Sequence, residues 1–430
     1  MQIYTVRSGD SINALARRYG VTQNAIVTAN QLDAPSNLVV GQTLVIPTEG
    51  TVHVIKPGDS LYGLSRQYGV SASAIQLANG ITNPLDLQVG MSIIIPDEEK
   101  SIVEVAAYVD PLISGDQSAR YVEEVGDYLT YVNIFSYHVK EDGSIEPIQN
   151  DEPIINAAYQ KRVAPLMVLT NFTEGQFSRE VATAILSDEA IQDKVLDEAI
   201  RIMKQKGYLG LDFDFEYLGA ENRIPYVNFL KKAKARLKAE DERYILTVAL
   251  APKIRDDQVG VLYEGHDYQA IGEVVDFIFF MTYEWGWSGG PPRAVSPLNE
   301  VRKVMDYAMS RVPSDKIMMG MPLYGYDWTL PFVRGGKFAK SIGFVDAVDL
   351  ARKYNQSIQY DTVAQSPFFR YRDEEGKEHE VWFEDARSLQ AKFNLVKELG
   401  LRGFFYWVLA REAPQNWLLV DNNFVVNKII

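Results

Sequence analysis

The chain has 430 residues, of which 47% are hydrophobic, so it can bury a large core and is long enough for more than one domain. Its formal net charge of −14 argues against nucleic acid as a partner, and the absence of any run of about 18 apolar residues argues against a membrane-spanning helix. The lack of cysteine excludes disulfides, thiol catalysis and cysteine-bound zinc. The opening MQIYTVRSGD has no charged and apolar leader, so we expect no signal peptide.

The chain begins with an internal repeat. Residues 4–47 recur as residues 53–96 at a constant offset of 49, with shared GDS, YGV and AN motifs and a final IP. Each copy predicts a strand, two short helices and a second strand. Two copies are too few for a solenoid, so we expect two separate beads.

Both copies resemble the LysM module from end to end. The resemblance implies a βααβ fold and a groove that binds glycans containing N-acetylglucosamine. The positions that it carries over as glycan-binding are Gly9, Asp10, Ser11 and Asn30 in the first copy and Gly58, Asp59, Ser60 and Asn79 in the second. Glycine, serine and asparagine also serve turns and helix caps, which is the alternative for these positions.

After a short polar linker the sequence alternates strands with helices. Strand-like runs occur at residues 102–109, 128–137, 163–172, 208–217, 244–252, 274–283, 316–326 and 402–409. Amphipathic helices are predicted between most of them, for example over residues 223–240 and 297–312. This pattern predicts an α/β protein with a (β/α)8 TIM barrel, whose reacting groups belong at the carboxyl ends of the strands.

The predicted domains follow from these boundaries. We expect LysM modules over residues 1–48 and 50–97 and a barrel over residues 100–430. The interval 329–401 is too long for one crossover, and two strand-like runs flank residues 373–376 as a hairpin. A small α+β insertion is therefore predicted before the last strand.

The fourth predicted strand, within LGLDFDFEYLG at residues 209–219, carries three carboxylates. Because strand side chains alternate, Asp212, Asp214 and Glu216 share one face, and the apolar Leu211, Phe213, Phe215 and Tyr217 share the other. A half-solvated strand and a divalent metal site are the alternatives. None of the four histidines lies at metal-ligand spacing from another, and no phosphate-binding glycine loop is evident, so neither a metal nor a cofactor is expected.

Polar and aromatic residues cluster at the ends of the other predicted strands. They are Tyr137 and Asn171 on strands two and three, Met281, Tyr283 and Glu284 on strand six, Tyr326 and Asp327 on strand seven, and Trp407 on strand eight. A single aromatic residue at such a position is more often ordinary core. Several that converge on three acids favour a sugar-binding site.

These motifs resemble glycoside hydrolase family 18, the chitinase-like fold. The matching elements are G-x-D-x-D-x-E on strand four, M-T-Y-E on strand six and F-F-Y-W-V-L on strand eight. Leu209 replaces an acid that usually opens the first motif, and Glu284 stands where many members have aspartate. Asn171 lies near the family's usual serine- and glycine-rich motif of the third strand. The change at Leu209 leaves the three carboxylates in place, and the departures at Glu284 and Asn171 bear on substrate contacts and not on the mechanism.

The resemblance implies a mechanism assisted by the substrate. Glu216 is the implied general acid, Asp214 orients the sugar's 2-acetamido group, and Asp212 shares a proton with Asp214. Tyr283 is the implied hydrogen-bond donor to the acetamido carbonyl, and Trp407 is the floor under the sugar ring. The other strand-end residues named above are expected substrate contacts.

Two LysM modules ahead of such a domain, without a leader, resemble the bacterial spore cortex-lytic enzymes. That resemblance implies an N-acetylglucosaminidase of cortex peptidoglycan, made in the mother cell, located in the coat and cortex region of the spore and used in germination. We expect a monomer with no nucleic acid and no membrane partner. Chitin hydrolysis and a catalytically silent glycan-binding coat protein are the alternatives.

Overall fold

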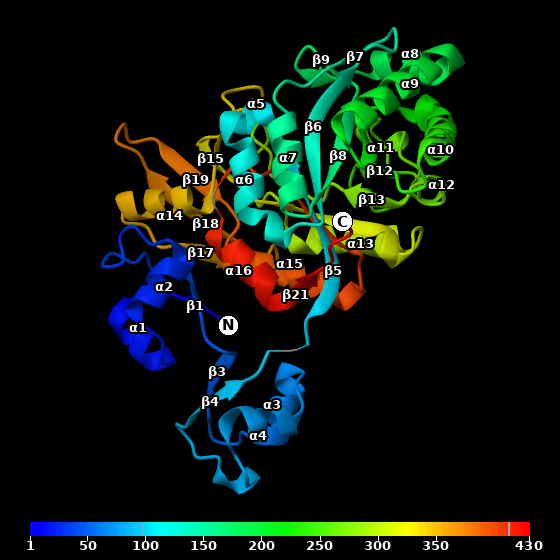
Figure 1. Cartoon of the computed structure of the whole chain (residues 1–430). Helices are drawn as coiled ribbons and strands as arrows, with labels where there is room; N and C mark the ends of the chain where they lie inside the picture. The colour runs from blue at the N-terminus through cyan, green and yellow to red at the C-terminus, as the bar shows by residue number, and fades with distance from the viewer. Residues whose placement is uncertain (98, 412) are drawn as a thin grey trace.

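A closed barrel of eight parallel strands forms the centre of the molecule (Figure 1). The computed structural model describes residues 1–97, 99–411 and 413–430. The barrel strands are β5 (Ser101–Val109), β6 (Tyr131–Val139), β8 (Ala164–Thr170), β11 (Gly210–Asp214), β12 (Ile245–Leu250), β13 (Phe277–Phe280), β14 (Ile317–Pro322) and β20 (Gly403–Trp407). Pairing of β5 with β6 closes the barrel, and all eight predicted strands are confirmed.

Helices cover the outside of the barrel (Figure 1). They are α5 (Pro111–Ser114), α6 (Ser118–Val125), α7 (Glu152–Gln160), α8 (Arg179–Ser187), α9 (Glu189–Lys206), α10 (Arg223–Glu240), α11 (Val261–Glu264), α12 (Tyr268–Gly272), α13 (Leu298–Met309), α15 (Ala386–Leu399) and α16 (Pro414–Asn423). The short strands β7 (Ile145–Glu146) and β21 (Phe424–Val426) flank the barrel sheet, and β9 (Phe172–Thr173) and β10 (Gln176–Phe177) form a separate hairpin. Among the helices that the structure describes, none has the length and apolar composition to cross a membrane.

Two separate cores explain the unusual pattern of the acidic strand. Leu211, Phe213 and Phe215 are fully buried among helix residues outside the barrel. Inside the barrel, aromatic side chains such as Tyr108 and Phe405 form a second core. A barrel strand backed by helices therefore points its apolar residues outward and leaves its inner face for the carboxylates.

The predicted insertion is a five-stranded antiparallel sheet with one helix. Its elements are β15 (Gly325–Thr329), β16 (Lys340–Ile342), α14 (Phe344–Lys353), β17 (Gln359–Asp361), β18 (Ser366–Arg372) and β19 (Glu378–Trp382). The predicted hairpin is present, with Arg372 opposite Glu378. The sheet begins at Gly325, slightly before the expected start, and α15, which lies within the predicted interval, buries its apolar residues in the core of the barrel.

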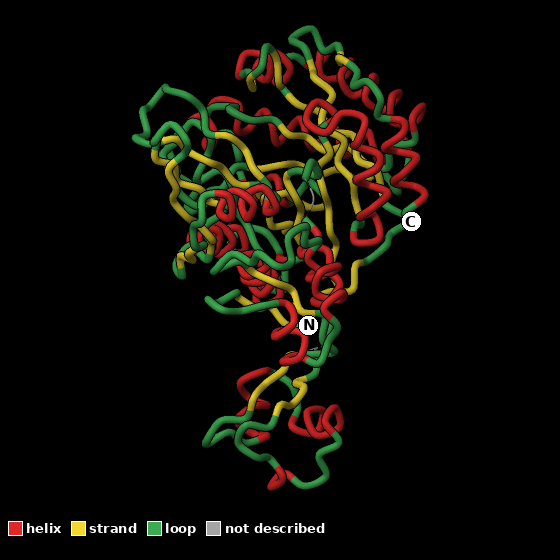
Figure 2. Tube along the Cα trace, turned by 90° about the vertical axis from the view of Figure 1, so that its left-hand side faces the viewer, coloured by secondary structure: helices red, strands yellow, loops and turns green. Residues whose placement is uncertain are grey.

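Each repeat folds as the predicted strand, helix, helix and strand. The first contains β1 (Gln2–Thr5), α1 (Ile12–Tyr19), α2 (Gln23–Asn30) and β2 (Thr43–Ile46), and the second contains β3 (Thr51–Val54), α3 (Leu61–Tyr68), α4 (Ala72–Asn79) and β4 (Ser92–Ile95). Ser11 and Ser60 cap the first helices through their hydroxyls, which satisfies free N–H groups at each helix start. Figures 1 and 2 show the second module projecting from the molecule.

The two modules are not equivalent beads, because the first is docked on the catalytic domain. Gln415 of α16 donates to Asn30 Oδ1 at 2.8 Å and to the Thr43 carbonyl at 2.9 Å. The Ile358 N–H donates to the Val40 carbonyl at 2.8 Å. Val45 joins the core of the barrel helices. The expectation of two independent beads is therefore wrong for the first module, since buried hydrogen bonds and apolar packing fix it.

We predict that Gly41→Ala loosens the docking of the first module and lowers the stability of the protein more than Gly90→Ala does. Gly90 is the matched control, because it occupies the same position in the second module. Both glycines have a left-handed backbone, with φ of +86° and +89°, so both variants carry the same local strain of roughly 1–2 kcal/mol. Only the Gly41 variant places a Cβ 1.9 Å from the Ile358 carbonyl oxygen. Thermal unfolding and limited proteolysis should show a lower melting temperature and faster cleavage for Gly41→Ala, and equal behaviour would contradict the docking.

Candidate active site

The acidic strand brings two carboxylates into the barrel and one to its edge. Asp212 and Asp214 are buried on β11, with exposed fractions of 0% and 4%. The strand ends at Asp214, and Glu216 lies partly exposed on the segment that follows. Tyr217 has a left-handed backbone and is 44% exposed, so the predicted alternation ends before it.

Asp212 is held by three neutral donors. It accepts hydrogen bonds from the Tyr108 hydroxyl at 2.6 Å, the Thr247 hydroxyl at 2.7 Å and the Asn133 amide at 3.0 Å. Burial raises the pKa of Asp212, and these three hydrogen bonds oppose that rise. Three donors on one carboxyl group match its ionised form, which accepts only.

Asp214 differs from Asp212 in that its buried Oδ1 atom has no hydrogen-bond partner among the described residues. Burial, followed by the charges of Glu216 and Asp212, raises the pKa of Asp214 well above its ordinary value. Its surroundings therefore favour the neutral form of Asp214, and its Oδ1 atom is free to bond a ligand. The described hydrogen bonds include none between Asp212 and Asp214, so the implied sharing of a proton is not seen in this structure.

The backbone of Glu216 is fixed from two sides. Asn171 Oδ1 accepts from the Glu216 N–H at 3.0 Å, and Asn171 Nδ2 donates to the Glu216 carbonyl at 2.8 Å. Burial raises the pKa of Glu216 to about 7. Asn171, an expected sugar contact, is itself fully buried and acts here as a positioning residue.

His266 fixes the backbone of Phe215, the residue before Glu216. It was not among the site residues predicted from the sequence. Its Nδ1 accepts from the Ala251 N–H at 3.1 Å, so the proton lies on Nε2, which donates to the Phe215 carbonyl at 3.0 Å. Burial lowers the pKa of His266 to about 4, so the ring stays neutral near pH 7. Only the tertiary structure brings this histidine to the acidic strand.

An aromatic surface lies beside the acids. The Trp407 ring centroid is 4.9 Å from that of Phe135 and 5.6 Å from that of Tyr108. Met281 and Tyr283 pack partly buried on the same inner core as Trp407. Burial, followed by the nearby carboxyl groups, raises the pKa of Tyr283 well above its ordinary value, so its hydroxyl remains a donor.

Tyr137 is not in the site, contrary to the prediction. It is fully buried on the outer face of β6, where its hydroxyl donates to Asp151 and its ring packs on Tyr208. The register of β6 against β8 shifts between Ile134 and Tyr137. Such an irregularity reverses which side chains point inward beyond it. Phe135 takes the inner position instead.

The remaining predicted contacts fall into two groups. Glu284 is partly buried and accepts from the hydroxyls of Tyr324 and Tyr326, the latter at 2.9 Å. Asp327 instead accepts from the Tyr371 hydroxyl at 2.7 Å and from His379 Nδ1 at 2.9 Å. Both partners belong to the insertion, so the structure gives Asp327 a role in holding that sheet together.

The predicted glycan positions of the modules also have structural partners. Asn30 is 2% exposed and bonds the Ile26 and Val45 carbonyls and the Val45 N–H, and Asn79 repeats this pattern in the second module. Asp10 and Asp59 accept from nearby backbone N–H groups at 2.7 Å. Gly9 and Gly58 form left-handed turns. Glycan contact by these residues stays a prediction, and burial of Asn30 argues against it there.

The arrangement supports proton transfer to a ligand by Glu216 and hydrogen bonding to it by Asp214 and Tyr283. Across residues 1–97, 99–411 and 413–430, no group of three histidine, aspartate or glutamate side chains could hold a metal ion.

Comparisons with known proteins agree with this geometry. Residues 170–412 match Glycosyl hydrolases family 18, and residues 4–47 and 53–96 each match the LysM domain. The chain is 49% identical to the cortical fragment-lytic enzyme of Bacillus subtilis, covering 100% of this chain and 99% of that protein. The crystal structure of the Bacillus megaterium spore cortex-lytic enzyme SleL superposes with a TM-score of 0.91 at 45% identity, covering 100% of this chain and 99% of the other.

We predict that the Glu216 carboxyl group titrates near pH 7. Burial favours its neutral form, so a reaction that takes a proton from Glu216 should slow as the pH rises through this value. NMR of protein labelled with ¹³C at the glutamate side chains can follow the titration, and loss of the signal in Glu216→Gln identifies it. A midpoint of about 4.3, typical of an exposed glutamate, would contradict the prediction.

Proposed function

Because the chain belongs to glycosyl hydrolase family 18 and carries two LysM domains, we propose that it is a spore cortex peptidoglycan hydrolase. It acts as an N-acetylglucosaminidase, which cleaves the glycosidic bond after N-acetylglucosamine. The observation that supports this activity most strongly is the pair of inner carboxyl groups behind Glu216, one held by three donors and the other without a partner. Similarity to cortical fragment-lytic enzymes over the whole chain supports the cortex as substrate.

The first step of the proposed reaction uses Glu216 as general acid. It gives its proton to the glycosidic oxygen while the bond from that oxygen to the anomeric carbon breaks. The 2-acetamido oxygen of the same sugar attacks the anomeric carbon and forms a cyclic oxazolinium ion. The unpaired Asp214 carboxyl bonds the acetamido N–H, and Tyr283 donates to the acetamido oxygen. Trp407 packs against the sugar ring.

The second step returns the proton to Glu216. The ionised Glu216 takes a proton from water, the oxygen of that water attacks the anomeric carbon, and the ring of the intermediate opens. The product keeps the β configuration, because the anomeric carbon is inverted twice. Asp212 remains ionised beside Asp214, and its negative charge stabilises the positive charge of the intermediate.

This mechanism restricts the substrate to sugars with a free acetamido group. N-acetylglucosamine has one, whereas a muramic lactam has its nitrogen tied into a ring. The mechanism therefore excludes cleavage after a muramic lactam and is consistent with the proposed cleavage after N-acetylglucosamine. The LysM domains retain the enzyme on the glycan, and two tethered weak sites raise avidity by roughly 10² to 10⁴ when both engage. The site of action is the spore.

Glu216→Gln should lower turnover of cortex fragments by about 10² to 10⁴, because the carboxamide cannot supply the proton. The matched control is Glu242→Gln, which makes the same change at an exposed position. Release of fragments can be measured by chromatography, and glycan binding by pull-down. Binding should survive in both variants. Normal turnover by a folded Glu216→Gln protein would show that Glu216 is not the acid.

A further inference from the structure

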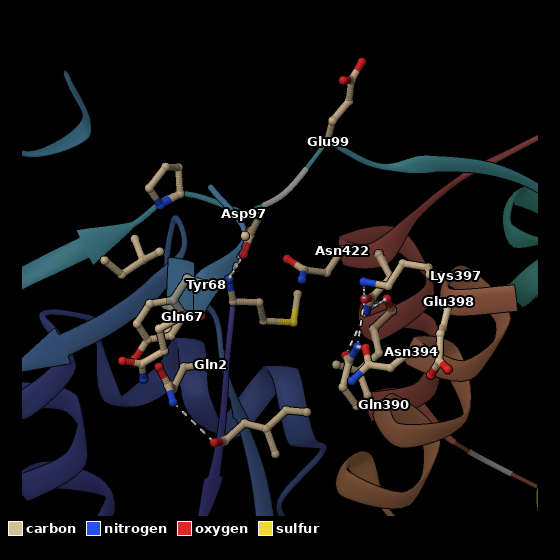
Figure 3. A pocket seen from close by; sticks show the side chains of 18 of the residues that line it. Gln2, Gln67, Tyr68, Asp97, Glu99, Gln390, Asn394, Lys397, Glu398 and Asn422 are labelled. Carbon is tan, nitrogen blue, oxygen red and sulfur yellow. Dashed lines mark hydrogen bonds and ion pairs between the residues drawn. The ribbon is translucent and has the colours of Figure 1, made fainter. Parts of the chain in front are cut away.

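A cavity of about 850 Å³ lies between the two modules and the helices α15 and α16 (Figure 3). Its size falls within the roughly 300–1,000 Å³ that ligand sites occupy. Its walls come from β1 of the first module, the end of α3 in the second module, and α15 and α16 of the barrel. None of its lining residues belongs to the group around Glu216, so it is separate from the active site.

Carboxamide side chains line both walls of this cavity. Gln67 lies on the wall of the second module, and Asn394 and Asn422 lie on the opposite wall (Figure 3). Within the described residues, the side chains of Gln67 and Asn422 have no hydrogen-bond partner. Asn394 uses its oxygen to accept from Gln390 at 2.8 Å, which leaves its NH₂ group available. A carboxamide both donates and accepts, as the hydroxyl and acetamido groups of a sugar require.

An aromatic side chain extends the same wall. Tyr68 lines the cavity beside Gln67, and its hydroxyl is bonded to His53 Nδ1 at 2.9 Å, which fixes the ring. Polar groups placed around an aromatic side chain are typical of sites that orient a ligand. The apolar face of a sugar ring can pack on such a ring while its hydroxyls meet the carboxamides.

The charges around the cavity do not favour an anion. Arg66 and Lys397 are balanced by Asp97, Glu99 and Glu398, and Met1 pairs with Asp97. A phosphate or polyanion site would need an excess of positive charge. The balance favours an uncharged ligand that binds through hydrogen bonds.

We propose that this cavity is a further glycan-binding site, which takes an uncharged stretch of a glycan that contains N-acetylglucosamine. The choice of ligand rests on the proposed function, and the site itself rests on the cavity and its unused carboxamides. It holds the polymer against the catalytic domain as well as against the modules. The docked first module supports it, because that module fixes one wall against α16.

The test uses full-length Glu216→Gln protein and the β-1,4-linked hexamer of N-acetylglucosamine, followed by calorimetry. An N-acetylglucosamine thiazoline first occupies the active site, so the remaining binding belongs to other sites. Adding Asn394→Ala and Asn422→Ala should weaken one binding step roughly tenfold, since each lost hydrogen bond is worth about 0.5–1.5 kcal/mol. Gln67→Ala on the opposite wall should weaken the same step.

Asn228→Ala is the matched control, because Asn228 is an exposed asparagine on another barrel helix, α10. It should bind the hexamer as the parent protein does. If the variants of either wall also match the parent, the cavity is a gap between domains and the proposal is overturned. That result differs from a failure of the proposed function, which would appear as turnover by Glu216→Gln and not as unaltered binding.

Discussion

The burial of an unpartnered Asp214 carboxyl next to a charged Asp212 is the constraint on which the site depends. Two buried carboxylates this close disfavour a second negative charge, and only Asp212 has donors that stabilise one. The pKa of Asp214 is therefore raised well above its ordinary value, and burial raises the pKa of Glu216 to about 7. In the proposed mechanism the nucleophile is therefore the substrate's own acetamido oxygen and not a carboxylate of the protein.

The barrel accommodates these buried carboxyl groups because its apolar residues form two separate cores, one outside the strands and one inside them. The helices bury the outward residues of β11, and aromatic side chains fill the barrel beneath the acids. Asn171 and His266 then fix the short segment beyond the strand, so that Glu216 has a defined position although it lies outside regular structure. The first LysM module is part of the same body, because Gln415 binds it to α16.

Local sequence patterns predicted the eight strands, the repeated modules, the hairpin of the insertion and the three acids. They failed where distant residues decide the outcome. An irregularity in β6 turns Tyr137 outward, and pairing with Tyr371 and His379 draws Asp327 into the insertion. Gln415 reaches Asn30 across 385 residues of sequence. Periodicity carries no information on such contacts, since each depends on how separate elements pack.

The proposed mechanism requires the acetamido group of N-acetylglucosamine, so the enzyme should cut the bond that follows this sugar. Mass spectrometry of the products from purified cortex fragments tests it most directly, because it identifies the sugar at each new reducing end. We expect N-acetylglucosamine at every new end. New ends that carry N-acetylmuramic acid would contradict the assigned bond, and new ends that carry a muramic lactam would contradict both the assigned bond and the role of the acetamido group.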